Sequence, residues 1–253
     1  MESSRREDEG EMKTRLLRRL QEEKSMRLKG GLYHQTQIKL AYNSNRIEGS
    51  KLSEEQTRYI FETNTLSTDP NETANVDDII ETVNHFSCFD YMLDAAEEKL
   101  SEELIKEYHR ILKSNTSDSR KEWFMTGDYK TLPNTVGDYE TTPPAEVRAA
   151  IACLLDSYNK SNTVEFESLV DFHYRFERIH PFQDGNGRVG RIILFKECLK
   201  NDIVPFIIED EYKLFYYRGL REFEKVPGYL VDTCLSAQDK YREMAGYFFG
   251  EKK

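Results

Sequence analysis

"HPFQDGNGRVGR", residues His180–Arg191, is the stretch that decides both the fold and the chemistry of this chain. Asp184-Gly185 and Asn186-Gly187 are turn-forming pairs, which alone would also suit a β-hairpin. The flanking sequence decides against a hairpin, because helical periodicity runs up to residue 179 and resumes at residue 189. The glycines therefore lie in a tight loop between two helices and open the second helix.

A glycine-rich loop that opens a helix is suited to binding anions. Glycines let the backbone approach a ligand closely, and the free N–H groups and the positive end of the helix dipole lie there. Arg188 and Arg191 emerge from neighbouring positions of this helix and can reach a phosphate. Asp184 is the natural oxygen ligand for a Mg²⁺ that accompanies a polyphosphate. His180 faces the same loop as a candidate proton acceptor, and Phe182 is expected to anchor the loop in the core.

Each of these features, taken separately, is more often structural. A His-Pro turn, an Asp-Gly or Asn-Gly turn and a pair of arginines on a solvated helix face are all common. Their joint spacing points to a phosphate site, because eight fixed positions match by chance with odds on the order of 10⁻¹⁰ per site.

The stretch resembles the signature of the Fic (Fido) domain family, on the pattern His180-x-Phe182-x-Asp184-Gly185-Asn186-Gly187-Arg188-x-x-Arg191. The characterised members of that family mostly transfer AMP from ATP to a side-chain hydroxyl of a target protein. The resemblance implies a mainly helical fold, and with the flanking elements it covers residues 40–230.

Carried over residue by residue, the resemblance implies that His180 deprotonates the target hydroxyl and that Asp184 holds Mg²⁺ or Mn²⁺ against the α- and β-phosphates. Arg188 would bind the outer phosphates and Arg191 the γ-phosphate. The nucleotide contacts of the loop and first helical turn would come from Gly185, Asn186, Gly187, Val189 and Gly190, the first three as the anion hole. Gly187 favours AMP transfer, since family members with a lysine there look like kinases.

Two further segments match the family. Residues 127–139 correspond to a β-hairpin flap that pairs with an extended segment of the target, with Val136 and Gly137 over the nucleotide. From the residues alone, a flap and a merely structural hairpin are equally favoured.

The second matching segment, "FYYRGL" at residues 215–220, resembles the lining of the adenine pocket and makes Tyr217 and Tyr216 predicted nucleotide contacts. Without the resemblance, two tyrosines on an amphipathic helix are more typical of the edge of a core. Glu224 departs from the family, because several members have an asparagine there that contacts adenine, and this bears on base preference.

"SNRIEG" at residues 44–49 matches the inhibitory motif of the family, [ST]-x-x-x-E-[GN]. The predicted inhibitory residues are Ser44, Glu48 and Gly49. The plain alternative is a helix that ends in a glycine cap. Under the inhibitory interpretation Glu48 pairs with Arg191, and that arginine then cannot also hold the γ-phosphate.

Composition limits the class of protein. The chain has 253 residues and a net charge of -10, which argues against general nucleic-acid binding. Its four cysteines are far apart, and neither zinc-ligand spacing nor a disulfide framework is expected. Reduced thiols, no signal sequence at the N-terminus and no long apolar run predict a cytoplasmic protein without a membrane segment. The expected partners are ATP and a target protein on the flap, with a homo-oligomer left open.

The periodicity predicts an all-α fold with one small hairpin. We expect helices at 7–29, 32–48, from Ser53 onward, and at 76–93, 101–112, 145–159, 164–179, 189–199, 209–224 and 228–249, with a hairpin around a Pro133-Asn134 turn. The helix at 7–29 carries Met12, Leu16 and Leu20 among many charges and is expected to be solvated or to face a partner. The predicted division is a charged helical extension at 1–30, a helical region with the inhibitory motif at 31–65, and the catalytic domain at 66–253.

Three functions compete. The first is a protein adenylyltransferase that modifies a Ser, Thr or Tyr hydroxyl of a target and of itself, inhibited by Glu48. The second is removal of AMP from a modified protein, in which Glu48 would orient a water. The third is a non-catalytic nucleotide-binding adaptor, which the histidine argues against because a binder needs no base.

Overall fold

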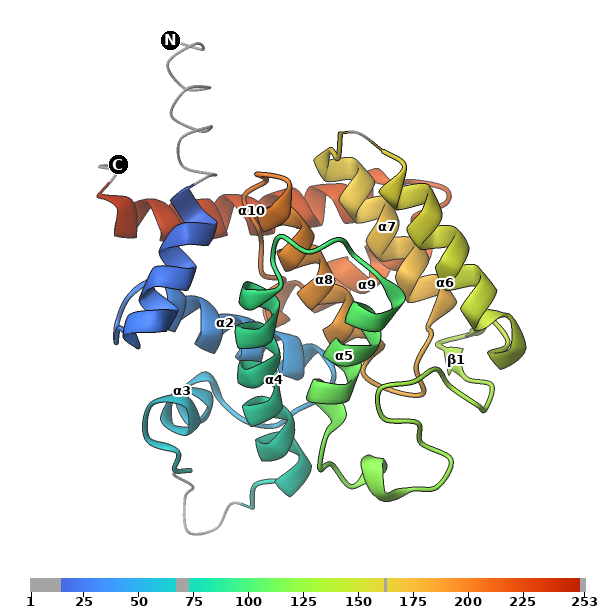
Figure 1. The fold of residues 1–253 in the computed structure, drawn as a ribbon, viewed down its shortest axis with the longest axis horizontal. Coiled ribbons are helices and arrows are strands. Elements are labelled where there is room, and N and C mark those ends of the chain that lie inside the picture. The colour runs from blue at the N-terminus through green and yellow to red at the C-terminus, as the bar shows by residue number, and fades with distance from the viewer. Residues whose placement is uncertain (1–14, 67–72, 162, 251–253) are drawn as a thin grey trace.

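The computed structural model describes residues 15–66, 73–161 and 163–250. Almost all of the regular structure in these ranges is helical (Figure 1), so the prediction of an all-α fold with one small hairpin is confirmed. Met12 and the start of the helix expected at 7–29 lie outside the described residues, as do residues 67–72 between the third and fourth expected helices. The first described helix covers residues 15–26, and the elements that follow it are α2 (Leu32–Ile47), α3 (Glu54–Thr63), α4 (Val76–Asp94), α5 (Glu102–Lys113), β1 (Thr135–Val136), β2 (Tyr139–Glu140), α6 (Pro144–Asn159), α7 (Phe166–Ile179), α8 (Asn186–Lys200), α9 (Lys213–Glu222) and α10 (Gly228–Phe249), with short 3₁₀ turns at Asp118–Arg120 and Asp210–Tyr212.

Local cap signals place several helix ends where the sequence predicts them. Ser53 and Gln56 form a reciprocal capping box at the start of α3, with bonds of 3.1 and 2.9 Å. Ser101 caps α5 by accepting the N–H of Leu104. Gly49 follows the end of α2 with a φ of +105°, a conformation that glycine adopts without strain.

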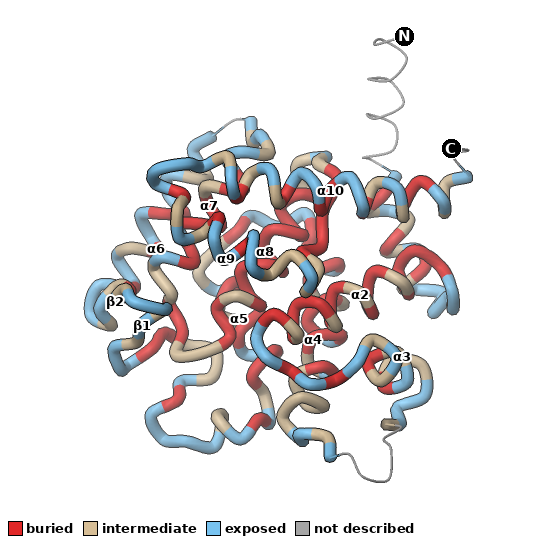
Figure 2. Tube along the Cα trace, turned by 180° about the vertical axis from the view of Figure 1, so that it is seen from behind, coloured by how far each residue is buried: buried red, intermediate tan, exposed pale blue. Residues whose placement is uncertain are grey.

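α8 is the central helix of the molecule. Every residue from Arg188 to Leu199 is buried, and the helix packs against α7, α5, α2 and α4. Figure 2 shows the buried residues gathered in the middle of the molecule and the exposed ones on loops and outer helices. Phe182, just before α8, is also fully buried, as the sequence predicts. The start of α8 therefore cannot shift without disturbing the main core.

The predicted turn of the hairpin is wrong. Its two strands pair antiparallel with Val136 opposite Tyr139, so the loop between them is Gly137-Asp138 rather than Pro133-Asn134. Gly137 has a φ of +57°, as tight two-residue hairpin loops require. Asn134 does not form the turn. Its side-chain amide donates to the Phe182 carbonyl at 3.1 Å and links the hairpin to the loop before α8.

The expectation that the first helix is solvated is also wrong. Leu16 and Leu20 are 1% and 0% exposed and belong to the main hydrophobic core. The Gln21 side chain donates to the Leu93 carbonyl at 2.9 Å, and Lys24 Nζ donates to the Asp90 carbonyl at 2.8 Å, so polar residues also fix the helix to α4. Two leucines four residues apart are therefore enough to bury one face of this helix in the main core.

No helix in the described ranges is both long and apolar enough to cross a membrane. This agrees with the composition, in which charged residues make up 32% of the chain.

We predict that Leu20→Ala lowers the free energy of unfolding by about 2–5 kcal/mol, because it opens a cavity in the core. Urea unfolding followed by circular dichroism measures this. Leu28→Ala is the matched control, since Leu28 is 42% exposed, and it should change stability by less than about 0.5 kcal/mol. Equal stability of the two variants would mean that the first helix is not part of the cooperative core.

Candidate active site

The loop between α7 and α8 has a fixed shape. His180 ends α7 with φ +51° and ψ +63°, a left-handed conformation that is uncommon for a residue other than glycine. The Asn186 side chain holds the loop closed, because its oxygen accepts the Phe182 N–H at 2.8 Å and its amide donates to the Phe182 carbonyl at 2.9 Å. Surrounding bonds, rather than local preference, therefore keep His180 where it is.

The N-terminus of α8 is open. Gly185, with a φ of +83°, precedes the helix, and neither a side-chain cap nor an acidic residue occupies the first turn. The Val189 N–H is the first to enter the helical ladder, donating to the Gly185 carbonyl at 3.0 Å. The free donors of an anion site are thus those of residues 186–188.

Two residues that the resemblance implies as contacts are turned inward. Val189 is fully buried, and its N–H is used within the helix. Gly190 faces the side chains of Glu177 and His173, which would touch any atom added at its Cα. The helix begins at Asn186, earlier than the sequence predicts. Residues 189 and 190 therefore lie within the helix, after the free N–H groups of its start.

His180 is held in the form that can accept a proton. Burial lowers the pKa of its imidazole to about 4, and the ammonium of Lys130 adds to this effect. Lys130 is buried in the base of the hairpin, where its Nζ donates to Asn134 Oδ1 at 2.7 Å and to Thr141 Oγ1 at 2.6 Å. Its backbone N–H donates to the Pro181 carbonyl at 2.9 Å. At neutral pH the imidazole is therefore uncharged.

Asp184 lies between two cations. Its Oδ2 accepts from Lys113 Nζ at 2.6 Å and from Arg188 Nη2 at 3.2 Å. Burial alone would raise the pKa of Asp184, but the charges of Arg188 and Lys113 outweigh burial and hold the pKa well below its ordinary value. Arg188, itself buried, also pairs with Glu81 of α4.

Arg191 is bound by the end of α2. Its Nη2 donates to Glu48 Oε1 at 2.6 Å and to the Ser44 carbonyl at 2.9 Å, and its Nε donates to Ser44 Oγ at 3.0 Å. The contact between Glu48 and Arg191 that the sequence predicts is therefore confirmed. Any Cβ at position 187 would lie against the Glu48 carboxylate, so Gly187 makes room for this ion pair.

The predicted hairpin flap and the two predicted tyrosines differ in how exposed they are. Gly137 has open space around it at the tip of the hairpin. Tyr216 is 1% exposed, and its hydroxyl is 2.6 Å from His173 Nε2, so it is a core residue in this state. Tyr217 is 40% exposed and donates to the Ile47 carbonyl at 3.0 Å, close to Glu48. Glu224 accepts the Tyr174 hydroxyl at 2.9 Å, a partner that sequence reasoning did not anticipate.

Sequence reasoning missed the residues that support the loop from other helices. His109 of α5 accepts the Gly127 N–H at Nδ1, at 2.9 Å, and its Nε2 donates to the Asp184 carbonyl at 3.1 Å. Its ring stacks on Phe182 with centroids 3.9 Å apart. Nothing in the local pattern around His109 distinguishes it from a core histidine, and the same holds for Lys113, Glu81, Lys130 and Glu177.

Glu177 is a second carboxyl near Arg191. It is buried and its Oε1 has no hydrogen-bond partner. Burial raises the pKa of this carboxyl to about 8, against the opposing charge of Arg191 and with a further contribution from Glu48.

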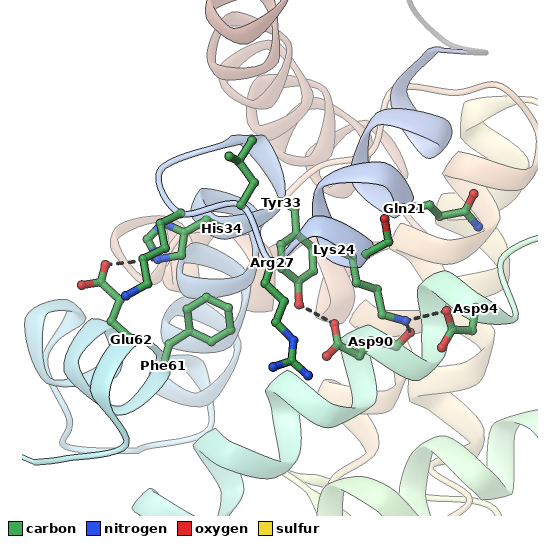
Figure 3. A pocket seen from close by; sticks show the side chains of 12 residues that line it. Gln21, Lys24, Arg27, Tyr33, His34, Phe61, Glu62, Asp90 and Asp94 are labelled. Carbon is green, nitrogen blue, oxygen red and sulfur yellow. Dashed lines mark hydrogen bonds and ion pairs between the residues drawn. The ribbon is translucent and has the colours of Figure 1, made fainter.

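A separate cavity of about 720 Å³ lies at the other end of α2, between the first helix, α3 and α4 (Figure 3). Its polar groups pair mainly with one another. The Tyr33 hydroxyl donates to Asp90 Oδ1 at 2.6 Å, and Lys24 binds the carbonyl of the same residue. No residue of the 180–191 loop lines this cavity.

Residues 99–197 match the Fic/DOC family. This part of the chain is similar to a Fic/DOC domain. The matched range contains the whole 180–191 loop and the hairpin, and the elements described above as supporting that loop, apart from α2 and α4, fall within it.

Curated relatives of the chain are named protein adenylyltransferases. Fic-1 of Caenorhabditis briggsae is 26% identical over 197 residues, which are 75% of this chain and 37% of that protein. A probable protein adenylyltransferase of Aquifex aeolicus is 34% identical over 88 residues, which are 34% of this chain and 27% of that protein. The chain thus spans about a third of the length of these relatives.

Solved structures share the fold over a larger part of the chain. A Fic domain containing signaling protein from Bacteroides thetaiotaomicron has a TM-score of 0.79 at 24% identity, and the alignment covers 97% of both chains. Residues 134–508 of Fic-1 from Caenorhabditis elegans give a TM-score of 0.69 at 20% identity, covering 96% of this chain and 74% of that one. The first described helix and α10, outside the matched family range, therefore belong to the same fold.

We predict that stability falls as pH rises from about 4.5 to about 8, because over this range the unfolded chain ionises Glu177 while the fold keeps it protonated. The pKa of Glu177 is raised from an ordinary value near 4.5 to about 8, so its protonated form favours the folded state below this range. Glu177→Gln, which cannot ionise, should lose less stability than wild type between about pH 6 and 9.

Thermal unfolding by calorimetry across that range measures the difference. Glu167→Gln, at an exposed position of α7, is the control and should follow wild type. Parallel curves for Glu177→Gln and wild type would contradict the raised pKa.

Proposed function

We propose that this chain is a protein adenylyltransferase, which transfers AMP from ATP to a Ser, Thr or Tyr hydroxyl of a target protein and of itself. The observation that carries the proposal is the neutral imidazole of His180 beside the open N-terminus of α8, with two buried arginines on that helix. The names of the curated relatives support it.

In the proposed reaction the target hydroxyl oxygen attacks the α-phosphorus of ATP. His180 takes the hydroxyl proton as the new O–P bond forms. The bond between the α- and β-phosphates breaks, and pyrophosphate leaves. Arg188, Arg191 and the N–H groups of residues 186–188 stabilise the negative charge that develops, which is the main task of a phosphoryl-transfer site.

Asp184 suits Mg²⁺ or Mn²⁺ that arrives with the nucleotide. Its side chain is 45% exposed at the mouth of the site. Among the described residues no group of three histidine, cysteine or acidic side chains could hold a metal by itself. One carboxylate, with phosphate oxygens and water as the other ligands, is the usual Mg²⁺ arrangement at nucleotide sites. When bound, the metal would neutralise phosphate charge.

The hairpin is the proposed docking place of the target. Its strands are two residues long, and an extended target segment could add to their edge. Val136, Gly137 and Tyr217 would then surround the nucleotide, with residues 66–253 as the catalytic domain. Tyr216 could contact it only after its neighbours move. Self-association and a cytoplasmic location remain predictions.

The end of α2 is the proposed inhibitor. Glu48 and Ser44 occupy the Nε and Nη2 donors of Arg191, which would otherwise be available to the γ-phosphate. A charge-assisted bond of this kind contributes about 1.5–3 kcal/mol. ATP would then bind weakly or in a non-productive pose until α2 moves.

Removal of AMP from a modified protein is the second candidate. The Glu48 carboxylate lies against Gly187 at the anion loop and is 28% exposed, so it could also orient a water there. The two candidates make opposite demands on Glu48, and one substitution separates them.

We predict that His180→Ala lowers AMP transfer by about 10²–10⁴-fold, because it removes the general base. Binding of ATP, measured by calorimetry, should stay nearly normal. Transfer is measured with labelled ATP and Mg²⁺, alone and with cell extract. A variant that keeps more than about half of the activity would show that another group is the base.

We also predict that Glu48→Gly raises self-labelling or target labelling by about tenfold or more, since about 1.4 kcal/mol shifts a population tenfold. Arg191→Ala should not reproduce this gain, because it removes the phosphate ligand together with the inhibitory pair.

Labelling of wild type and Glu48→Gly side by side is the measurement. Equal or lower labelling by the variant would remove the inhibitory interpretation. Loss of AMP removal from a modified target would favour the hydrolytic candidate.

A further inference from the structure

Four charged side chains form a closed ring beneath the anion loop. Lys113 Nζ lies 2.6 Å from Glu81 Oε1 and 2.6 Å from Asp184 Oδ2. Arg188 closes the ring, because it pairs with the second oxygen of Glu81 and, at 3.2 Å, with Asp184 Oδ2. Asp118 adds a third carboxylate, 3.4 Å from Lys113 Nζ.

Unlike the buried Lys130, whose ammonium binds uncharged oxygens, Lys113 is enclosed among carboxylates. Its side chain is 2% exposed, and it reaches Asp184 from the last residue of α5. Carboxylates stabilise an ammonium that is taken out of water, and here three lie around it. Lys113 thus occupies the place where those carboxylates would otherwise meet a cation from solution.

We propose that Lys113 is a resident cation at Asp184, which neutralises the metal-binding carboxylate until nucleotide brings a divalent ion to it. This inference rests on the proposed function, since it concerns the same site. Lys113 touches neither the nucleotide nor the reacting atoms in this arrangement, so it is a positioning residue. It acts by keeping Asp184 and Arg188 aligned while it disfavours the binding of free metal.

The charges of the ring predict the direction in which metal affinity changes when Lys113 is removed. Lys113 and Arg188 balance Glu81 and Asp184, and Asp118 pairs also with Lys121, so the cluster carries no net negative charge that would attract a free divalent cation. Loss of the lysine charge leaves carboxylate charge in excess around Asp184, whose oxygens suit Mg²⁺ and Mn²⁺. Removing Lys113 should therefore increase metal affinity, whereas general damage to the site would decrease it.

The experiment is a Mn²⁺ titration of the full chain without nucleotide, followed by electron paramagnetic resonance. Lys113→Ala should bind Mn²⁺ about tenfold more tightly than wild type or better, since a unit charge at hydrogen-bonding range is removed. Lys121→Ala is the matched control. Lys121 pairs with Asp118 at 2.6 Å but is partly exposed and makes no contact with Asp184, so its loss should leave Mn²⁺ affinity within about twofold of wild type.

Lys113→Gln guards against a folding defect, because it keeps the side-chain length and a hydrogen-bond donor and removes only the charge. It should also bind Mn²⁺ more tightly, and Mn²⁺ should raise its unfolding temperature more than that of wild type. Unchanged or weaker Mn²⁺ binding by the folded variants would overturn the proposal. AMP transfer by wild type, measured separately, tests the proposed function, so the failure of one does not imply the failure of the other.

Discussion

The start of α8 is at once the centre of the fold and the mouth of the candidate site. The helix is buried from Arg188 to Leu199, yet the N–H groups of its first turn are open to a ligand. The apolar residues that follow Arg191 pack against four helices and fix the axis of α8. Phe182 and Asn186 fix the loop before it. The direction in which the backbone donors point therefore depends on core packing, so these donors are already aligned before an anion binds.

Burial creates a second constraint, because both arginines of the motif are almost completely removed from water. A buried guanidinium without a counter-charge is strongly unfavourable. The fold supplies one carboxylate to each arginine from helices that precede the matched family range, Glu81 of α4 and Glu48 of α2. The contact between Glu48 and Arg191 therefore stabilises the fold as well. Any phosphate that enters must offer a better counter-charge than the carboxylate that it displaces.

Local patterns predicted the helices and their caps well, as Ser53 and Ser101 show, because a cap depends on residues three or four positions away. The 180–191 loop was predictable for the same reason. The pairing of Glu48 with Arg191 joins residues 143 apart in sequence and was accessible only through a family resemblance. Lys113 and Glu81 carry no signal of either kind. The burial of the first helix was missed because its sequence is rich in charged residues. Its two leucines are nevertheless enough to bury one face of the helix.

The two carboxyls near Arg191 are not equivalent, and this limits what can replace Glu48. Glu177 is buried, and its raised pKa keeps it largely protonated at neutral pH. A neutral carboxylic acid cannot balance a guanidinium, so Glu177 is not the counter-ion of Arg191 while Glu48, whose charge helps to raise the pKa of Glu177, is in place. Ser44 offers only uncharged oxygens. Withdrawal of Glu48 would take away the carboxylate that balances the buried Arg191, and under the proposed function the γ-phosphate of ATP would supply the missing charge. Release of α2 and capture of the nucleotide are therefore expected to be energetically coupled through this one arginine.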